Sequence, residues 1–235
     1  MTIRSRPSTT ITRALAITLV VALPALALEQ PKPEAECLTY DSAYESAPLF
    51  EIKPDAGQQR VYLFNRTQRC SGEQPCASRQ KSFLVAGDVV FAGPPNRGFR
   101  CAYYGTAKGR IVAGFVPIEN LESLSEDNGF SEEFVAGSWA YDDDTIAIKP
   151  AGSGLVAGEG HATYQTATTI NEGDFSGQAS IKTGQKELMF KDGEGDTACI
   201  VTLRRRGPYL IAEDNSMCGG MNVRFNGIYT RVRSK

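Results

Sequence analysis

Six cysteines and one histidine are the residues of this 235-residue chain best suited to covalent chemistry. Cys218 lies beside two glycines in the stretch MCGGMNVRFNGIY, where a nucleophile could sit in a backbone cradle. A catalytic thiolate needs a neighbouring base, and His161 is the only histidine that could supply one. The same stretch also fits half of a disulfide at a tight turn, so the surroundings of Cys218 must decide between the two interpretations.

The residues around Cys218 favour the disulfide. A hairpin turn is expected between Gly207 and Pro208, and counting outward from it places Cys199 opposite Ser216, two residues short of Cys218. Cysteines whose Cα atoms lie within about 7 Å can be joined, and a loop of about 20 residues would be stabilised by roughly 3 kcal/mol. We therefore predict a Cys199–Cys218 disulfide and no catalytic residue, with a cysteine-dependent enzyme as the less favoured alternative.

The other four cysteines complete an even set, which is typical of exported proteins with a disulfide framework. Cys70 and Cys76 flank a short loop that a local bridge would close, which leaves Cys37 to pair with Cys101. Four cysteines allow three connectivities, so the other two pairings stay open. With one histidine and one closely spaced cysteine pair, the chain is poorly suited to zinc, and we predict neither a metal nor a cofactor.

The N-terminus has the features of an export signal. Three arginines precede or flank the apolar run ALAITLVVAL (14–23), and the small residues ALA (25–27) follow it. The run is about half of the roughly 20 residues that span a bilayer. We predict a signal peptide over residues 1–27, no membrane span in the mature chain, and a periplasmic or secreted location.

The charge balance disfavours two classes of partner. Three of the 25 basic residues fall in the signal peptide, which leaves 22 basic and 27 acidic residues and a net charge of −5. An acidic balance argues against binding to nucleic acid and against general adhesion to anionic lipid.

Turn residues recur every eight to twelve positions beyond the signal, with short alternating runs between them, which is the pattern of β-sandwiches and small barrels. A polar segment (28–36) and an acidic segment (125–133) interrupt this pattern. We predict two all-β domains, residues 37–124 and 134–235, joined by the second of these linkers.

Four stretches of the first predicted domain share a pattern: a strand that leads into a Gly-Asp turn, a Gly-Phe strand start, and Gly-Phe-Val-Pro before a short turn. The stretches are RVYLFN (60–65), SFLVAGDVVFAGPP (82–95), GFRCAYYG (98–105) and RIVAGFVPIENL (110–121). This pattern resembles that of the bacterial SH3-like (SH3b) family. The resemblance implies an SH3-like barrel that binds peptides, which in bacterial members are often cell-wall peptides.

The aromatic residues of this domain are candidates for core or for peptide binding. We expect Phe99 and Phe115 in the core. Tyr103 and Tyr104 are adjacent in one strand and must point to opposite faces, so one of them is expected at the surface as a partner-binding residue.

The second predicted domain reads as eight hairpin-linked strands, which favours a small, antiparallel, up-and-down barrel. The expected strands are 139–141, 145–149, 155–164, 174–181, 187–191, 199–205, 209–214 and 222–233.

Two ends of this domain resemble the calycin group of lipocalin-like barrels. GSW (137–139) opens the first strand, and Arg231 and Arg233 lie in the last. The resemblance implies that Trp139 and Arg231 close the barrel floor through a cation–π contact. The stretch DNSMCGGMNVRFNGIY (214–229) is also similar to proteobacterial periplasmic proteins of unassigned function.

Three charged clusters remain. The aspartates of 142–144 and 192–196 fall where tight turns are expected, which favours turns over calcium sites. Arg204, Arg205 and Arg206 form a basic cluster at the end of a hairpin, which is either a solvated surface or a docking patch for an acidic partner.

These features together predict a non-catalytic, exported binding protein. Its expected partner is a cell-wall peptide or an envelope protein, for instance a hydrolase that it inhibits, and its oligomeric state stays open. The alternative is a small-ligand carrier that uses the barrel interior, although short strands usually give a barrel filled by side chains.

Overall fold

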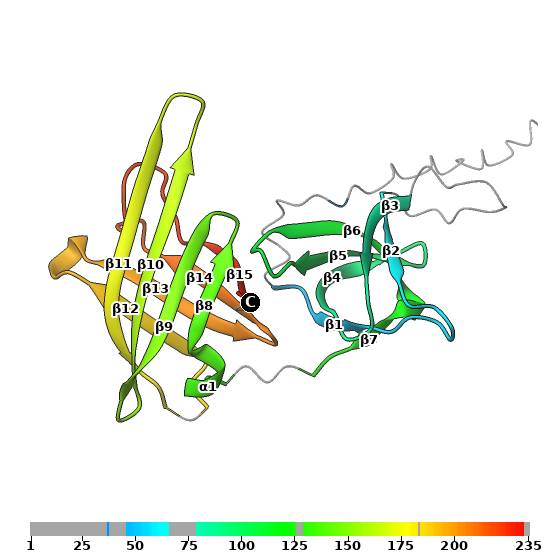
Figure 1. Cartoon of the computed structure of the whole chain (residues 1–235), viewed down its shortest axis with the longest axis horizontal. Helices are drawn as coiled ribbons and strands as arrows, with labels where there is room; N and C mark the ends of the chain where they lie inside the picture. The colour runs from blue at the N-terminus through cyan, green and yellow to red at the C-terminus, as the bar shows by residue number, and fades with distance from the viewer. Residues whose placement is uncertain (1–36, 38–45, 66–78, 126–128, 183, 233–235) are drawn as a thin grey trace, which may run out of the picture. The chain divides into compact units, whose positions relative to one another are not determined.

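The computed structural model describes residues 37, 46–65, 79–125, 129–182 and 184–232 (Figure 1). The predicted signal peptide, the linker over residues 28–36 and the predicted Cys70–Cys76 bridge lie outside these residues. The described chain is almost entirely β-structure, with one α-helix, α1 (Glu132–Val135), and this confirms the all-β prediction.

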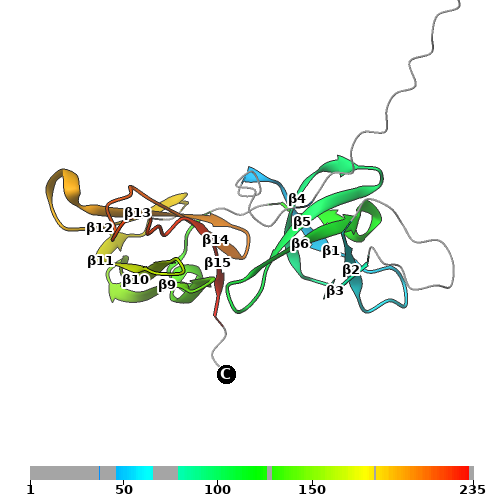
Figure 2. The ribbon, with the colours of Figure 1, turned by 90° about the horizontal axis from the view of Figure 1, so that it is seen from above.

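Seven strands form the first sheet. They are β1 (Leu49–Ile52), β2 (Val61–Phe64), β3 (Arg79–Leu84), β4 (Val89–Asn96), β5 (Phe99–Gly105), β6 (Ile111–Pro117) and β7 (Leu121–Ser123). Their order across the sheet is β3-β2-β6-β5-β4-β1-β7, and every pairing is antiparallel. Figure 2 shows β2 and β3 beside the β4–β6 strands.

The core of the first sheet contains the two phenylalanines assigned to it from the sequence. Phe99 and Phe115 are both 2% exposed, and the ring of Phe99 packs edge-on against that of Phe64 at 5.6 Å. Gly114, within Gly-Phe-Val-Pro, has a packing reason as well, because a Cβ there would lie 2.8 Å from the Cβ of Leu63. The absence of a side chain lets β2 lie close to β6.

Eight strands form the second sheet. They are β8 (Gly137–Tyr141), β9 (Asp144–Gly152), β10 (Leu155–Gln165), β11 (Ile170–Ser180), β12 (Glu187–Asp192), β13 (Cys199–Arg206), β14 (Tyr209–Asp214) and β15 (Gly227–Arg231). The order β11-β10-β9-β8-β15-β14-β13-β12 places strands that are consecutive in sequence side by side, except β11 and β12 at its two ends, and pairs the last strand, β15, with the first, β8. This is an up-and-down meander of the predicted number of strands.

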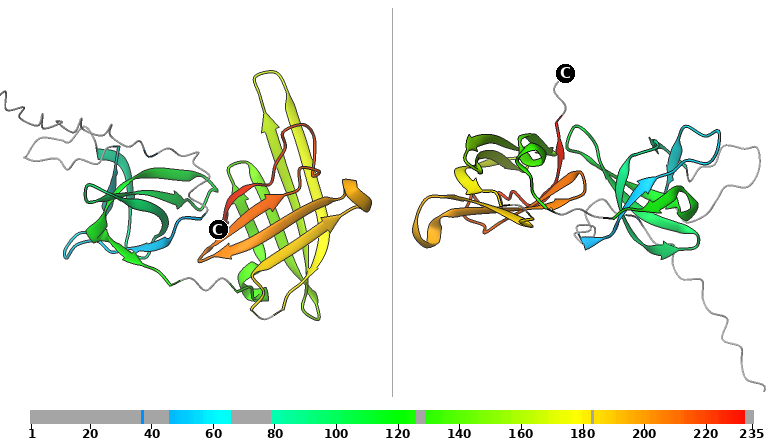
Figure 3. Two further views of the ribbon diagram at one scale, coloured as in Figure 1. Left: turned by 180° about the vertical axis from the view of Figure 1, so that it is seen from behind. Right: turned by 90° about the horizontal axis from the view of Figure 1, so that it is seen from below.

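The meander is nearly closed into a barrel (Figure 3). The β8–β15 ladder, with Trp139 opposite Arg231, joins the first strand of the second sheet to its last strand. The remaining seam lies between β11 and β12, where the backbone N–H of Ser176 donates to Asp192 Oδ2 at 2.8 Å. A side chain at Gly177 would lie 2.8 Å from the carbonyl oxygen of Lys191, so the two edges approach closely without forming a ladder.

The last strand is shorter than predicted. We expected it to begin at Asn222, but β15 begins at Gly227. The preceding segment turns inward instead: Val223 and Phe225 are 1% and 0% exposed, and Asp214 Oδ2 accepts a hydrogen bond from the backbone N–H of Phe225. The alternation of apolar residues in this segment therefore reflects side chains that fill one end of the barrel, not a strand.

The predicted Cys199–Cys218 disulfide is confirmed, with a Cα–Cα distance of 4.5 Å. The hairpin register is the expected one, since Arg206 lies opposite Tyr209. The side chain of Asn215 organises the turn before Cys218, because its Oδ1 accepts from the N–H of Ile200 at 3.0 Å and its Nδ2 donates to the carbonyl of Ala198 at 2.8 Å. A second disulfide joins Cys37 to Cys101, and none of the described cysteines is free.

Residues of both sheets share a buried cluster. Leu49, Phe91 and Tyr103 of the first sheet pack with Tyr209 and Ile211 of the second. The Tyr209 hydroxyl also donates to the carbonyl of Val89. Because this cluster contains residues from both sheets, the division into two independently folding domains stays a prediction. No helix of the described chain is long and apolar enough to cross a membrane.

We expect the double variant Cys199→Ala/Cys218→Ala to lower the free energy of unfolding by roughly 3 kcal/mol, because the bridge closes a loop across 19 positions. Urea unfolding at neutral pH measures the loss. Wild-type protein assayed in strong reductant is the control and should lose at least as much, since reduction opens the other disulfides too. A loss under about 1 kcal/mol would contradict the assigned stabilising role.

Candidate functional site

Aromatic rings fill much of the barrel interior. Phe175 of β11 packs against Phe190 of β12 and against Phe225, with ring centroids 5.8 and 5.0 Å apart. Two glycines of β10 make room for them: a Cβ at Gly158 would lie 2.5 Å from Phe190, and one at Gly160 would lie 2.3 Å from Phe175. The space beneath β10 is therefore occupied by protein, which disfavours the ligand-carrier alternative for this part of the barrel.

The expected contact between Trp139 and Arg231 is present at one end of the barrel. The guanidinium carbon of Arg231 lies 4.6 Å from the Trp139 ring centroid, and Trp139 is fully buried. Arg231 also donates to the carbonyls of Phe134 and Ala136, and the Trp139 indole N–H donates to the carbonyl of Val135 at 2.9 Å. These bonds use carbonyls at the end of α1, so the helix is held over the end of the barrel.

The basic cluster of Arg204, Arg205 and Arg206, for which a docking patch was one of two interpretations, makes contacts within the chain instead. Arg204 pairs with Glu213 on the neighbouring strand. Arg205 lies over the Phe134 ring, with its guanidinium carbon 4.0 Å from the centroid, and donates to the carbonyl of Gly129 at 2.9 Å. Arg206 donates to the carbonyl of Ala47 at 2.8 Å. Each guanidinium therefore has a partner within the chain, and the sequence could not show the partners of Arg205 and Arg206 at Gly129, Phe134 and Ala47 because these lie far away along the chain.

The tyrosine pair does not provide the expected exposed aromatic residue. Tyr103 is 6% exposed and packs in the cluster shared by the two sheets, with Tyr209 and Phe91. Tyr104, on the opposite face, is half-buried, and its hydroxyl donates to Asp88 Oδ1 at 3.0 Å. The prediction that the two tyrosines point to opposite faces of β5 was correct, but other parts of the chain pack against both faces.

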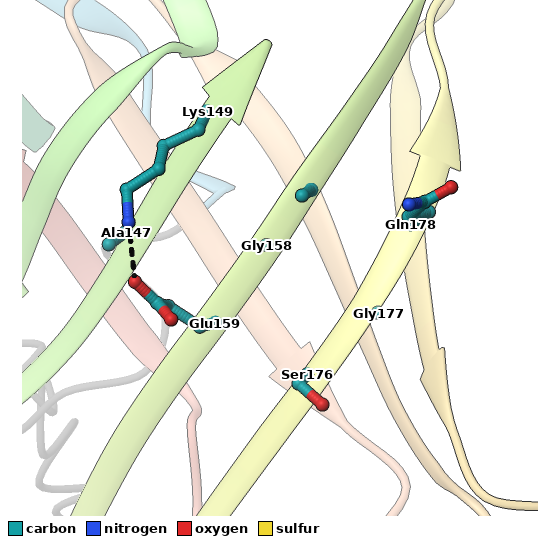
Figure 4. A pocket seen from close by; sticks show the side chains of 8 residues that line it. Ala147, Lys149, Gly158, Glu159, Ser176, Gly177 and Gln178 are labelled. Carbon is teal, nitrogen blue, oxygen red and sulfur yellow. Dashed lines mark hydrogen bonds and ion pairs between the residues drawn. The ribbon is translucent and has the colours of Figure 1, made fainter. Parts of the chain in front are cut away.

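A different site lies on the outer face of β9, β10 and β11. Two adjoining hollows there have volumes of about 330 and 480 Å³, and we call them together the outer groove. Figure 4 shows the first of them, with Lys149, Glu159 and Ser176 over the strands. The outward-facing residues that line the groove are Thr145, Ala147, Lys149, Ala157, Glu159, His161, Asp174, Ser176 and Gln178, and Asp192 at the end of β12 borders it.

Opposite charges alternate along the outer groove. Lys149 Nζ lies 3.0 Å from Glu159 Oε1, and His161 Nδ1 lies 2.8 Å from Asp174 Oδ1. The small side chains of Ala147 and Ala157 lie beside these pairs and leave the groove open. Such a surface offers both hydrogen-bond donors and carboxylates to a ligand that carries both charges.

The carboxylates around His161 favour its charged form. The hydrogen bond that the His161 ring donates to the Asp174 carboxylate raises the pKa of His161 above its usual value, and the charges of Asp174, Glu172 and Asp144 act in the same direction. Its Nδ1 is used by Asp174, so only Nε2 faces the groove. No hydrogen bond joins it to Ser176 among the described contacts, and the two do not form a nucleophile–base pair.

Among the described carboxyl groups, Asp144, the first residue of β9, has the one strongly shifted pKa. Burial raises its pKa from 3.8 to about 6, and the charges of Asp142 and Asp143 add to the effect. The backbone N–H of Thr163 donates to Asp144 Oδ1 at 2.9 Å and partly opposes the shift.

The structure does not bring Cys218 and His161 together as a catalytic pair. Cys218 is disulfide-bonded and buried in the barrel core, whereas His161 lies on the outer face. This removes the thiolate on which the cysteine-enzyme alternative depended. The aspartates of 142–144 lie at the turn between β8 and β9, as expected, where Asp142 has a positive φ of 51°.

The sequence analysis missed the outer groove. The one available signal was the alternation in β10, which places Glu159 and His161 on the face opposite Val156 and Ala162. Which residues of β9 and β11 stand beside them depends on strand register, and the sequence alone does not give it.

The chain matches no family model, no curated protein and no solved structure.

We expect Arg231→Ala to lower the free energy of unfolding by about 2–3 kcal/mol, because it removes a partly buried cation–π contact and the donors to two carbonyls. Urea unfolding measures the change. Arg224→Ala is the matched control: Arg224 is half-exposed and its nearest carboxylate oxygen is 3.8 Å away, so its loss should be under about 1 kcal/mol. Equal effects of the two variants would contradict the role given to Arg231.

We expect Asp144→Asn to stabilise the protein at pH 7.5 and to have little effect at pH 4. A carboxyl whose pKa is raised to about 6 in the folded state contributes stability below its unfolded value of 3.8, and this contribution is lost as the pH rises through 6. Asparagine keeps an oxygen for the Thr163 N–H and carries no charge. Because the site is half-exposed, solvent screening limits the gain to about 1 kcal/mol.

Thermal unfolding at the two pH values tests this expectation. Asp143→Asn is the control, since Asp143 is exposed and should change the melting temperature little at either pH. A melting temperature of Asp144→Asn below that of the wild type at pH 7.5 would show that the buried charge is better compensated than its contacts indicate.

Proposed function

We propose that this chain is a non-catalytic binding protein of the bacterial periplasm that recognises cell-wall peptide through the outer groove. The observation that carries the proposal is the groove itself, with its alternating Lys149–Glu159 and His161–Asp174 pairs. Wall peptides carry carboxylates and amino groups along one short chain. Lys149 and protonated His161 offer cations to the carboxylates, while Glu159 and Asp174 offer anions to the amines.

The location is supported by the disulfides and by the expected export signal. The Cys199–Cys218 and Cys37–Cys101 bridges are compatible with an oxidising, extracytoplasmic compartment. The resemblance of residues 60–121 to bacterial SH3-like domains also favours a wall peptide as the partner.

The test is binding of the full mature chain to purified peptidoglycan. We expect the protein to co-sediment with insoluble peptidoglycan and to bind a soluble muropeptide in calorimetry. Ala147→Trp should reduce binding at least about tenfold, because the indole would occupy the groove between the two charged pairs.

The matched control is Thr202→Trp, which places the same ring on the outward face of β13, away from the groove. We expect this variant to bind as the wild type does. The proposal fails if neither peptidoglycan nor muropeptide binds the wild type, or if Ala147→Trp and Thr202→Trp bind alike. Hydrolysis of peptidoglycan by the purified protein would overturn its non-catalytic part.

A further inference from the structure

One face of the β2–β3 hairpin gathers cations and aromatic rings. Alternation along the two strands places every second residue on this face, and the opposite face carries the buried Val61, Leu63 and Leu84. The residues on the exposed side are Arg60, Tyr62, Arg79, Lys81, Phe83 and Val85.

Four of these residues form a continuous stack, which we call the arginine–aromatic ladder. The Arg60 guanidinium carbon lies 4.3 Å from the centroid of Phe83, and that of Arg79 lies 4.4 Å from the centroid of Tyr62. The two rings lie opposite each other across the strands and meet edge-on, with centroids 6.0 Å apart. The order is therefore Arg60, Phe83, Tyr62, Arg79.

The ladder remains open to solvent. Phe83 and Val85 are each 41% exposed, which is high for large apolar side chains. Asp88, three residues beyond Val85, is already used: its two oxygens accept from the N–H of Val85 at 2.8 Å and from the Tyr104 hydroxyl at 3.0 Å. Within the described chain, no ion pair joins Arg60, Arg79 or Lys81 to a carboxylate.

The local charge is opposite to that of the whole chain. The described parts of the hairpin, residues 58–65 and 79–85, contain three basic residues and no acidic one, whereas the chain has a net charge of −2. A concentrated positive surface on an acidic protein selects for negatively charged partners and would repel another positive surface.

Stacking prepares the two arginines to bind carboxylates. When a guanidinium lies over an aromatic ring, the ring contacts the flat face of the guanidinium. The N–H donors point outward in the guanidinium plane, where they can bind a carboxylate with two hydrogen bonds. Exposed aromatic residues beside arginines are also the side chains that contribute most to protein–protein interfaces.

We propose that the arginine–aromatic ladder is a docking surface for an acidic, extended segment of a partner protein. The strand β3 lies at the edge of its sheet, so an extended segment has room to run along the hairpin. Its carboxylates would meet Arg60, Arg79 and Lys81, and its apolar side chains would cover Phe83 and Val85. The ladder lies on the first sheet and the outer groove on the second, so this inference does not depend on the proposed function.

The test is fluorescence anisotropy of the mature protein with a labelled eight-residue peptide of alternating Glu and Val. We expect saturable binding that weakens several-fold as salt is raised from about 50 to 200 mM, because the attraction is screened. Arg60→Glu/Arg79→Glu should raise Kd at least about tenfold. Arg60→Lys/Arg79→Lys, which keeps the charge but loses the planar donors, should give an intermediate loss.

The matched control is Lys182→Glu/Lys186→Glu, which makes the same change in net charge at two exposed lysines of the second sheet's loop. We expect its Kd to stay within about twofold of the wild type. The melting temperatures of all variants are compared, and Phe83→Ala provides a ladder variant without a charge change that should also weaken binding.

Five outcomes would overturn the proposal. Equal losses in the ladder and control variants would show a general charge effect. No binding of the peptide, or equal binding of its Lys-for-Glu counterpart, would remove the acidic partner. Tighter, ladder-dependent binding of heparin would assign the surface to an acidic polysaccharide, and ladder-dependent dimerisation in sedimentation would assign it to a second copy of the chain.

Discussion

The contact of Arg231 with Trp139 is the interaction on which the second sheet depends. It joins the last strand to the first at the position where the two are hydrogen-bonded, and it ties the short α1 helix to the end of the barrel through the carbonyls of Phe134 and Ala136. Arg205 lies over Phe134 as well. Two cations and two rings thus hold four separate segments together. Burial lowers the pKa of Arg231, but an arginine remains charged over the physiological range, so the contact persists.

A nearly closed and filled barrel determines where binding can take place. Phe175, Phe190 and Phe225 occupy the interior beneath the two glycines of β10, and Val223 fills one end. Specific recognition is therefore expected on outer faces, where strand alternation displays every second side chain. The structure offers two such faces, the outer groove on β9–β11 and the arginine–aromatic ladder on β2–β3.

The two surfaces differ in the chemistry they offer. The outer groove presents both charges over small side chains, which suits a short ligand with amino and carboxylate groups. The ladder presents cations and rings without acidic residues, which suits an acidic polypeptide.

The buried cluster that the two sheets share includes Tyr103 of the first sheet and Tyr209 of the second. Burial raises the pKa of the Tyr209 hydroxyl far above its usual value, so this hydroxyl stays protonated and donates to Val89.

The sequence by itself determined the all-β class, the eight strands of the second sheet to within a few residues and the Cys199–Cys218 bridge. These features depend on short-range patterns: alternation with a period of two, turn residues and the counting of positions across a hairpin. The same patterns could not decide what covers each exposed face. Alternation placed Tyr103 and Tyr104 on opposite sides of β5, but only the tertiary structure showed that Tyr103 packs against Tyr209. Likewise, the partners of Arg205 and Arg206 lie more than 70 positions away in sequence, and the outer groove and the ladder exist only through strand register. Contacts between distant segments are set by how the whole chain packs, and no local pattern encodes them.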